Sequence, residues 1–173
     1  TTTEQVQAAL RQIGISSDNP QGLFISGYFA EEEKRFAIPY NMVLASNVDA
    51  LNFLAAQLET LSTGERAELN AALQATQSEL FSIGRITDFP ENVDYYVHLP
   101  DVHGPAQLGD YYLNRSGMVD MPEEWKGGID TAQFGRYVAQ QEQGAFTQYG
   151  YLVKSGDEWQ KVHEGQPVPE EYR

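Results

Sequence analysis

The residues of this sequence most suited to chemistry are carboxylates, and they gather between residues 88 and 130. This segment holds nine acids against only two cations, Arg115 and Lys126, so its formal charge of −7 is half of the −14 carried by the whole chain. The acids are Asp88, Glu91, Asp94, Asp101, Asp110, Asp120, Glu123, Glu124 and Asp130. They are spaced along expected caps, turns and polar helix faces, unlike the dense acidic runs of disordered tails. This spacing predicts an extended negative surface on folded elements.

An extended negative surface has the charge pattern of duplex DNA. DNA carries about one negative charge per 1.7 Å of its axis, and proteins bind it in Lys and Arg grooves that gain from counterion release. Carboxylates at comparable spacing would occupy such a groove by the same mechanism and with the same sensitivity to salt. Because Lys and Arg number 11 against 25 Asp and Glu, the chain itself should be repelled by nucleic acid and by anionic membranes. Its expected partner is a basic protein surface.

A small hydrolase is an alternative use of the same carboxylates. Glu123 or Glu124 would act as acid or base together with His98 or His103, which requires a concave pocket and a raised carboxylate pKa. The simpler explanation of two adjacent glutamates is that the positive end of a helix macrodipole favours them. The sequence also contains no G-x-x-x-x-G-K-[ST], G-x-G-x-x-G, H-E-x-x-H or G-x-S-x-G motif. We therefore predict no catalytic residue.

A metal site is a further alternative, because Asp94, His98, Asp101 and His103 lie close together in the sequence. However, a strand that ends at Pro100 would send the two histidines in unrelated directions, and loop histidines exposed to water are the simpler explanation. The chain has no cysteine, which excludes disulfides, Cys-ligated zinc and iron–sulfur clusters. We expect neither a metal nor a cofactor.

Hydrophobic periodicity and capping residues predict an α+β fold that positions these acids. Helices are expected over residues 1–13, 46–61, 62–84, 105–116, 123–126 and 130–141, and strands over 23–29, 35–43, 93–97, 146–154 and 158–162, followed by a frayed tail. The two middle helices are joined by about two residues and should form a helical hairpin. We expect three small subdomains in tandem: 1–45 with an N-terminal helix and a β-hairpin, 46–87 with the helical hairpin, and 88–173 as a C-terminal α+β subdomain with short antiparallel strands.

The stretch over residues 118–130 resembles the antirestriction motif of the ArdA family, which has an Asp, a hydrophobic residue, Pro-Glu, and an Asp seven residues after the Glu. The positions that match it in order are Asp120, Met121, Pro122, Glu123 and Asp130. Residues 51–55, 108–113, 130–136 and 146–151 are similar to the family's Leu-Asn-x-Leu-Ala, Leu-Gly-x-Tyr-Leu, Asp-Tyr-x-x-Phe/Tyr-Gly-Arg and Phe-Thr-x-x-Gly-Tyr fragments. The five fragments follow the family order over about two-thirds of the chain.

The resemblance implies an elongated, curved α+β rod that dimerises and occupies the DNA groove of type I restriction–modification enzymes, on their methyltransferase core. ArdA proteins are carried by conjugative plasmids and transposons, so a mobile genetic element is implied. The nine acids would then be mimic charges. The apolar residues of the motif would form the contact between the two copies of a dimer: Met118, Val119, Met121, Pro122, Trp125 and Ile129. Residues 1–45 diverge from the family's usual opening domain, and Lys126 places a cation inside the motif.

We therefore predict a non-enzymatic antirestriction protein, an acidic DNA mimic that inhibits type I restriction–modification enzymes. We expect a cytoplasmic homodimer that binds neither nucleic acid nor membranes directly. Two alternatives stay open. One is an acidic inhibitor or adaptor of another basic nucleic-acid-binding host protein, and the other is the carboxylate-dependent hydrolase described above.

Overall fold

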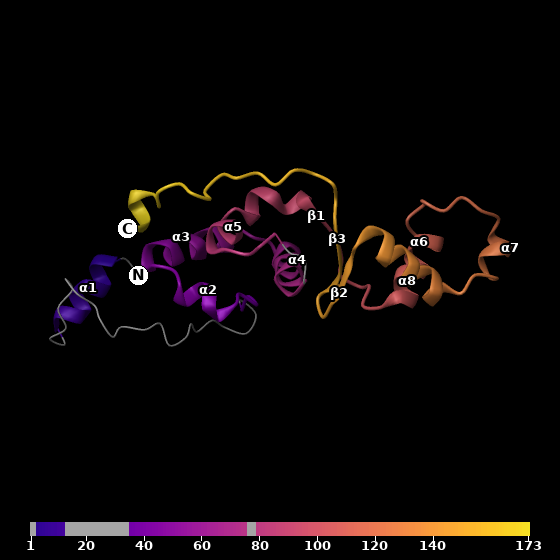
Figure 1. Ribbon diagram of the computed structural model, residues 1–173, viewed down its shortest axis with the longest axis horizontal. Coiled ribbons are helices and arrows are strands. Elements are labelled where there is room, and N and C mark those ends of the chain that lie inside the picture. Colours follow the sequence, from indigo (N-terminus) through magenta and orange to yellow (C-terminus); the bar gives the residue numbers. More distant parts are fainter. Residues whose placement is uncertain (1–2, 13–34, 76–78) are drawn as a thin grey trace. The chain divides into compact units, whose positions relative to one another are not determined.

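The computed structural model describes residues 3–12, 35–75 and 79–173 (Figure 1). The helices are α1 (Thr3–Gln12), α2 (Tyr40–Leu44), α3 (Val48–Glu59), α4 (Thr63–Gln74), α5 (Ile83–Thr87), α6 (Pro105–Asn114), α7 (Glu123–Lys126) and α8 (Thr131–Glu142), with 3-10 helices η2 (Phe89–Tyr95) and η3 (Glu170–Tyr172). The strands are β1 (Tyr96–Leu99), β2 (Ala145–Thr147) and β3 (Gly150–Lys154). Helices and a small antiparallel sheet occur together, so the predicted α+β class is confirmed.

The described residues fall into two units, each with its own internal packing. Unit 1 takes those within Thr1–Arg66, Glu79–Asn92 and Gln160–Arg173, and unit 2 takes those within Ala67–Ser78 and Val93–Trp159. Neither unit is continuous in sequence, because the last residues of the chain belong to unit 1 while the sheet before them belongs to unit 2. The three tandem subdomains expected from the sequence stay a prediction.

Unit 1 is built around α3 and α5, which pack against each other. Phe53, Leu54 and Leu58 of α3 are buried, as are Ile83 and Ile86 of α5. The apolar positions of α3 recur at the helical spacing seen in the sequence, so one face of this helix enters the core while the opposite face meets water. This core supports the elements that hold the end of the chain.

Capping residues begin helices α3 and α4, with the cap of α3 one residue after the expected start at residue 46. The side chain of Asn47 accepts a hydrogen bond from Ala50 N at 2.8 Å. Before α4, Ser62 N donates to Glu65 Oε2 at 2.7 Å, and Ser62 Oγ accepts from Glu65 N at 3.4 Å. The hydrogen bonds with the Ser62 side chain and backbone lower the pKa of Glu65. These caps satisfy N–H groups that a helix leaves unpaired in its first turn.

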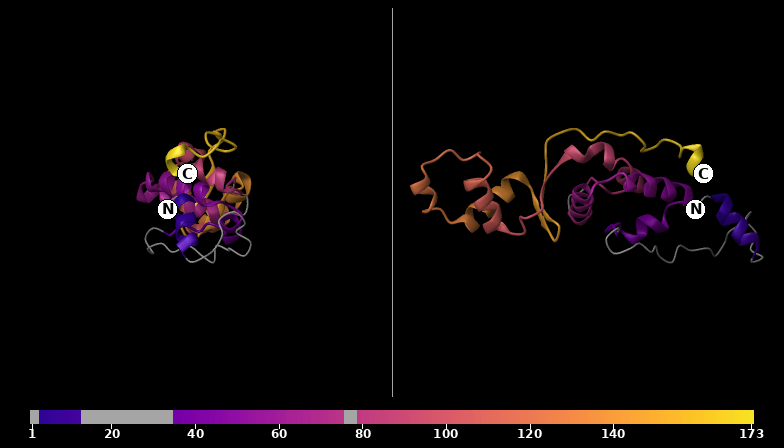
Figure 2. Two further views of the ribbon diagram at one scale, coloured as in Figure 1. Left: turned by 90° about the vertical axis from the view of Figure 1, so that its left-hand side faces the viewer. Right: turned by 180° about the vertical axis from the view of Figure 1, so that it is seen from behind.

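Unit 2 contains the sheet, whose strand order is β1-β3-β2 with both pairs antiparallel. Tyr96 pairs with Lys154, and Leu99 pairs with Tyr151. Helices α6 and α8 lie side by side in this unit (Figure 1 and Figure 2). Tyr151 of β3 and Leu108 of α6 are both fully buried, so the sheet and the helices share one core.

The crossing of α6 and α8 depends on one glycine in each helix. A Cβ atom added to Gly109 would lie 1.9 Å from the backbone oxygen of Thr131, and one added to Gly135 would lie 1.8 Å from that of Pro105. Protein interiors are packed as closely as organic crystals, so backbone atoms at this distance leave no space for a side chain. Both glycines lie in fragments that resemble the family pattern of the sequence.

Most predicted helices are confirmed, while the helix over 62–84 is divided. Helices α3, α6, α7 and α8 occupy the expected stretches, and α1 covers the described part of 1–13. Helix α4 ends at Gln74 and a separate helix, α5, begins at Ile83. Ser82 accepts a hydrogen bond from Arg85 N at 3.2 Å, which starts α5 with a cap of its own. None of the described helices combines the length and the apolar character needed to cross a bilayer.

The structure departs more from the predicted strands than from the predicted helices. Residues 35–43 are wrong as a strand, because Pro39 is the N-cap of α2 and its carbonyl accepts a hydrogen bond from Met42 N at 3.0 Å. The strand over 93–97 starts only at Tyr96, since η2 occupies the preceding residues. Residues 158–162 form no strand, and the predicted closing hairpin lies instead within the stretch 145–154, where β2 pairs with β3. The predicted strand over 23–29 lies outside the described residues.

The end of the chain is packed, so the predicted frayed tail is also wrong. Residues 170–172 form η3, and the Tyr172 ring lies 5.0 Å from the Phe53 ring between centroids. The sequence of this tail offers little apolar periodicity, which is why a packed end was not expected. Its contacts with α3 come from the tertiary structure.

Candidate functional site

Seven of the nine predicted acids belong to unit 2, and we call them the acidic set. They are Asp94, Asp101, Asp110, Asp120, Glu123, Glu124 and Asp130. Asp110 is half-buried and the other six are exposed. They come from η2, the turn after β1, α6, the loop before α7, α7 itself and the N-cap of α8. Because they sit on separate elements, the fold and not a single flexible run sets their positions.

Asp110 and Asp130 of the acidic set are also held by hydrogen bonds. The Asp110 carboxylate accepts from Asn114 Nδ2 and from Arg115 Nη2, each at 2.8 Å. The hydrogen bond from Asn114 is the main cause of the lowered pKa of Asp110, and Arg115 adds to it. Asp130 caps α8 by accepting from Gln133 N at 3.0 Å. These bonds favour the charged form of a carboxylate and fix its direction.

The two cations within residues 88–130 both form local ion pairs. Arg115 pairs with Asp110, and Lys126 Nζ lies 2.6 Å from Glu123 Oε1. Exposed pairs of this kind contribute about 0–1 kcal/mol, so they are weak constraints on the fold. Five acids of the set have no ion-pair partner among the described residues: Asp94, Asp101, Asp120 and Glu124, together with Asp130, which caps α8. Their charge therefore remains available to a partner.

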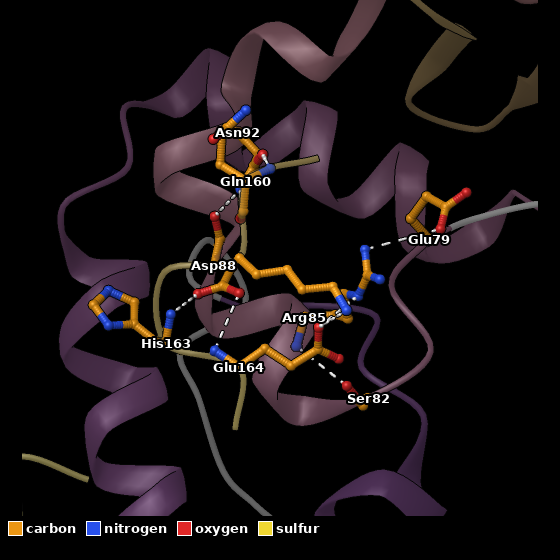
Figure 3. A network of polar contacts seen from close by, with 9 residues as sticks. Glu79, Ser82, Arg85, Asp88, Asn92, Gln160, His163 and Glu164 are labelled. Atoms are coloured by element: carbon orange, nitrogen blue, oxygen red, sulfur yellow. Dashed lines mark hydrogen bonds and ion pairs between the residues drawn. The ribbon is translucent and has the colours of Figure 1, made fainter. Parts of the chain in front are cut away.

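Asp88 does not belong to the acidic surface, which corrects the expectation from the sequence. It is fully buried in unit 1, and its carboxylate accepts hydrogen bonds from the backbone N–H groups of His163 and Glu164 (Figure 3). A buried carboxylate that is bonded in this way cannot act as an outer charge. Glu91 is exposed but belongs to unit 1. Asp88 is left out of the function proposed below.

The apolar residues of the motif are unusually exposed for their type. Met118 is 74% exposed and Trp125 is 65% exposed. Pro122 is exposed as well, and the remaining motif residues are half-buried: Val119, Met121 and Ile129. Large apolar side chains in water are typical of surfaces that contact another protein. The structure therefore places apolar and acidic side chains of the motif together in the stretch around α7.

The hydrolase alternative requires a glutamate paired with a histidine, and the observed contacts differ from this. The Nε2 atom of His98 lies 2.6 Å from the backbone oxygen of Tyr149. His103 is exposed, and so are both Glu123 and Glu124. In the part of the chain that the structure describes, no hydrogen bond or ion pair joins either glutamate to a histidine, and no three His, Asp or Glu residues come together to hold a metal ion.

Sequence reasoning missed a carboxylate that supports unit 2 from within. Glu142 accepts a hydrogen bond from the Tyr112 hydroxyl at 2.5 Å and another from the Tyr151 hydroxyl at 3.0 Å. It is the last residue of α8, so it links that helix to α6 and β3. Both tyrosines lie in fragments that resemble the family pattern, which was the only sequence signal near this cluster.

The Tyr112 and Tyr151 cluster predicts a loss of stability in alkaline solution. Burial raises the pKa of both tyrosines from 10.0, and Glu142 raises it further. Above about pH 10 the unfolded chain therefore loses protons that the folded chain keeps, so the free energy of unfolding falls as pH rises, by on the order of 1 kcal/mol per tyrosine per pH unit. Urea unfolding at pH 9, 10 and 11 measures this slope.

The matched variants Tyr112→Phe and Tyr137→Phe separate this cluster from tyrosines in general. Tyr137 is 60% exposed, so its replacement should leave the alkaline slope unchanged. Replacement of Tyr112 should make the slope shallower, because one raised pKa is removed. Equal slopes in the two variants would contradict the role assigned to Glu142.

Comparison with known proteins gives one family. The family model described as antirestriction protein (ArdA) matches residues 1–153 of this 173-residue chain. The matched range includes the whole acidic set, the motif around α7 and the glycines of the α6–α8 crossing. No curated protein gives a match.

Proposed function

Because this chain belongs to the ArdA family of antirestriction proteins, we propose that it inhibits type I restriction–modification enzymes by presenting carboxylates in the place of DNA phosphates. The target surface would be the DNA groove of the methyltransferase core. The chain would act in the cytoplasm, where a restriction enzyme meets incoming DNA, and it would act without catalysis, cofactor or direct contact with nucleic acid.

The observation that carries this proposal is the set of uncompensated carboxylates in unit 2. Asp94, Asp101, Asp120 and Glu124 are exposed on different elements and have no ion-pair partner among the described residues. A groove lined by Lys and Arg binds such charges as it binds phosphates, and attraction of this kind speeds the encounter of the two molecules. The proposal therefore rests on charges held by a fold and not on net charge alone.

We assign the exposed apolar residues of the motif to assembly, as the contact between two copies of this chain. Met118 and Trp125 are the most exposed of them. Dimer contacts are more apolar than the rest of a protein surface, whereas a DNA groove offers few apolar side chains. Sedimentation of the wild type and of Trp125→Ala tests this assignment, which predicts a dimer for the former and a weakened dimer for the latter.

Plating of unmodified phage tests the proposed function directly. Hosts with and without a type I system would each be transformed with this gene or with an empty vector. We expect the gene to restore plating only on the restricting host, since a host without the system has nothing to inhibit. Unchanged restriction in cells that contain the folded protein would overturn the proposal.

Salt dependence is a second expected property of this function. If carboxylates replace phosphates, binding of the purified enzyme should weaken by at least about tenfold between 50 and 200 mM salt, because charged contacts are screened and counterions compete for them. Titration of the enzyme at several salt concentrations, with DNA as the reference ligand, measures the slope. A flat response would point to an apolar contact instead. Capture of a different basic host protein would favour the adaptor alternative.

A further inference from the structure

The end of the chain, residues 160–173, returns to unit 1 and lies along α5 and α3; we call it the C-terminal segment. In Figure 1 it is the yellow trace that ends beside α3. Most of it is irregular backbone, with only the short helix η3 at its end. An irregular segment cannot satisfy its own backbone groups, so the residues that bond to it decide how it is held.

Asp88 binds the backbone of this segment. One carboxylate oxygen accepts from His163 N at 2.5 Å, and the other accepts from Glu164 N at 3.2 Å (Figure 3). Hydrogen bonds from N–H groups to a carboxylate are among the stronger ones, and a buried charge without such bonds would be costly. Because the contacts use backbone atoms, Asp88 recognises the path of a peptide and not its side chains.

Asn92 binds the same backbone one helical turn later. Its Oδ1 atom accepts from Gln160 N at 2.6 Å, while its Nδ2 atom donates to Gln160 O at 2.9 Å. The Nδ2 atom also donates to Asp88 O at 2.7 Å, which holds the side chain in place. A side-chain amide that pairs both backbone groups of one residue does what a neighbouring β-strand does. Asp88 and Asn92 together satisfy three N–H groups and one carbonyl.

Side chains of the segment add contacts around this backbone grip. The His163 ring meets the Phe53 ring edge-on with centroids 4.9 Å apart. Arg85 Nε lies 3.1 Å from Glu164 Oε2. Glu164 also passes close to Gly84, where an added Cβ atom would lie 3.5 Å from Glu164, an ordinary van der Waals distance. These contacts lie on α3 and α5, and they give the segment a defined register.

We propose that α3, α5 and η2 form a binding site for an extended peptide, and that the C-terminal segment is its ligand within the same chain. The residues that bind, Phe53, Arg85, Asp88 and Asn92, lie inside the range matched by the family model, whereas the ligand lies after residue 153. The segment is a separable ligand, so it detaches while α3 and α5 stay folded. This proposal is independent of the inhibition of restriction enzymes.

Hydrogen exchange in the full chain tests whether the segment is a separable ligand. In the variant Asp88→Asn, the amide NH₂ faces one of the two backbone N–H groups, so one hydrogen bond is replaced by a clash of donors. We expect the amides of His163 and Glu164 to exchange at least about tenfold faster than in the wild type, while those of α3 keep their protection. The control Glu59→Gln removes one exposed charge from unit 1 and should change neither.

Two results would overturn the proposal: unchanged exchange at His163 and Glu164, or equal loss of protection in α3 and in the segment. The second result would mean that the segment is an inseparable part of the core. A second experiment applies if Asp88→Asn fails to fold. A protease site placed at the exposed residues 155–158 of the otherwise wild-type chain is cut, and a labelled peptide of residues 159–173 is added in excess.

The labelled peptide should bind the cut chain and not the uncut chain. In the uncut chain the attached segment competes at an effective concentration in the millimolar range, which excludes an added peptide. Saturable binding to the cut, folded chain supports a peptide site. Its absence, with circular dichroism showing that the helices remain, contradicts it.

Discussion

Replacing Asp94, Asp101, Asp120 and Glu124 together by their amides should weaken inhibition of a type I enzyme by roughly 5- to 600-fold. Each exposed charge contributes about 0.2–1 kcal/mol in a pairwise contact, so a single replacement should change inhibition by only about 1.5- to fivefold. The four are distributed over separate elements and have no ion-pair partner among the described residues, so their effects should add. Titration of the purified enzyme with each variant measures the loss.

The control removes the same charge from unit 1. Four exposed glutamates of unit 1 lie outside the predicted mimic charges: Glu4, Glu59, Glu170 and Glu171. Replacing all four by glutamine changes the net charge by the same amount. This variant should inhibit nearly as well as the wild type. If both quadruple variants lose equal potency, net charge and not the acidic set is responsible. If neither loses potency, the mimicry proposal fails.

Gly109→Ala and Gly135→Ala should each destabilise unit 2 by about 3 kcal/mol or more. The added Cβ would lie within 2.0 Å of a backbone oxygen, at 1.9 and 1.8 Å respectively, and backbone atoms cannot move aside as a flexible side chain does. Overpacking of a well-packed site costs about 1–3 kcal/mol and sometimes more, out of a total stability of about 5–15 kcal/mol. Urea unfolding followed by circular dichroism measures the change.

Gly127→Ala is the matched control in the same unit. A Cβ at this position meets nothing within 4 Å, and the backbone has φ −63, which any residue adopts. Its stability should therefore stay within about 0.5 kcal/mol of the wild type, as surface substitutions usually do. Equal stability of Gly109→Ala and Gly127→Ala would contradict the tight crossing.

The crossing of α6 and α8 bears on the proposed function because these helices hold two of the acids. Asp110 lies on α6, and Asp130 caps α8. A helix forced away from its neighbour would carry its acid with it, so Gly135→Ala should also reduce inhibition. Charges that act together must be held close to their working positions, and packed helices hold side chains more precisely than loops do.

Much of the helical fold could be predicted from the sequence, because its signals are local. Ser62 and Asp130 cap helices as expected, Asn47 caps α3 one residue after the expected start, and each cap joins residues only three positions apart. The number of acids and the net charge of residues 88–130 could also be counted directly from the sequence. The strands were predicted less well, since residues 35–43 have strand-like composition but Pro39 starts a helix instead. Strand propensity depends on having a partner strand, which composition does not reveal.

The sequence by itself determined the family motif, the sign of the charge and where most helices begin, since these depend on neighbouring residues. Only the tertiary structure decided which acids face water. Asp88 looks like its neighbours in the sequence, yet it is buried because backbone N–H groups 75 and 76 residues later come to its carboxylate. Glu142 is likewise turned toward two tyrosines. Burial is settled by the segments that meet in space, and no local pattern contains that information.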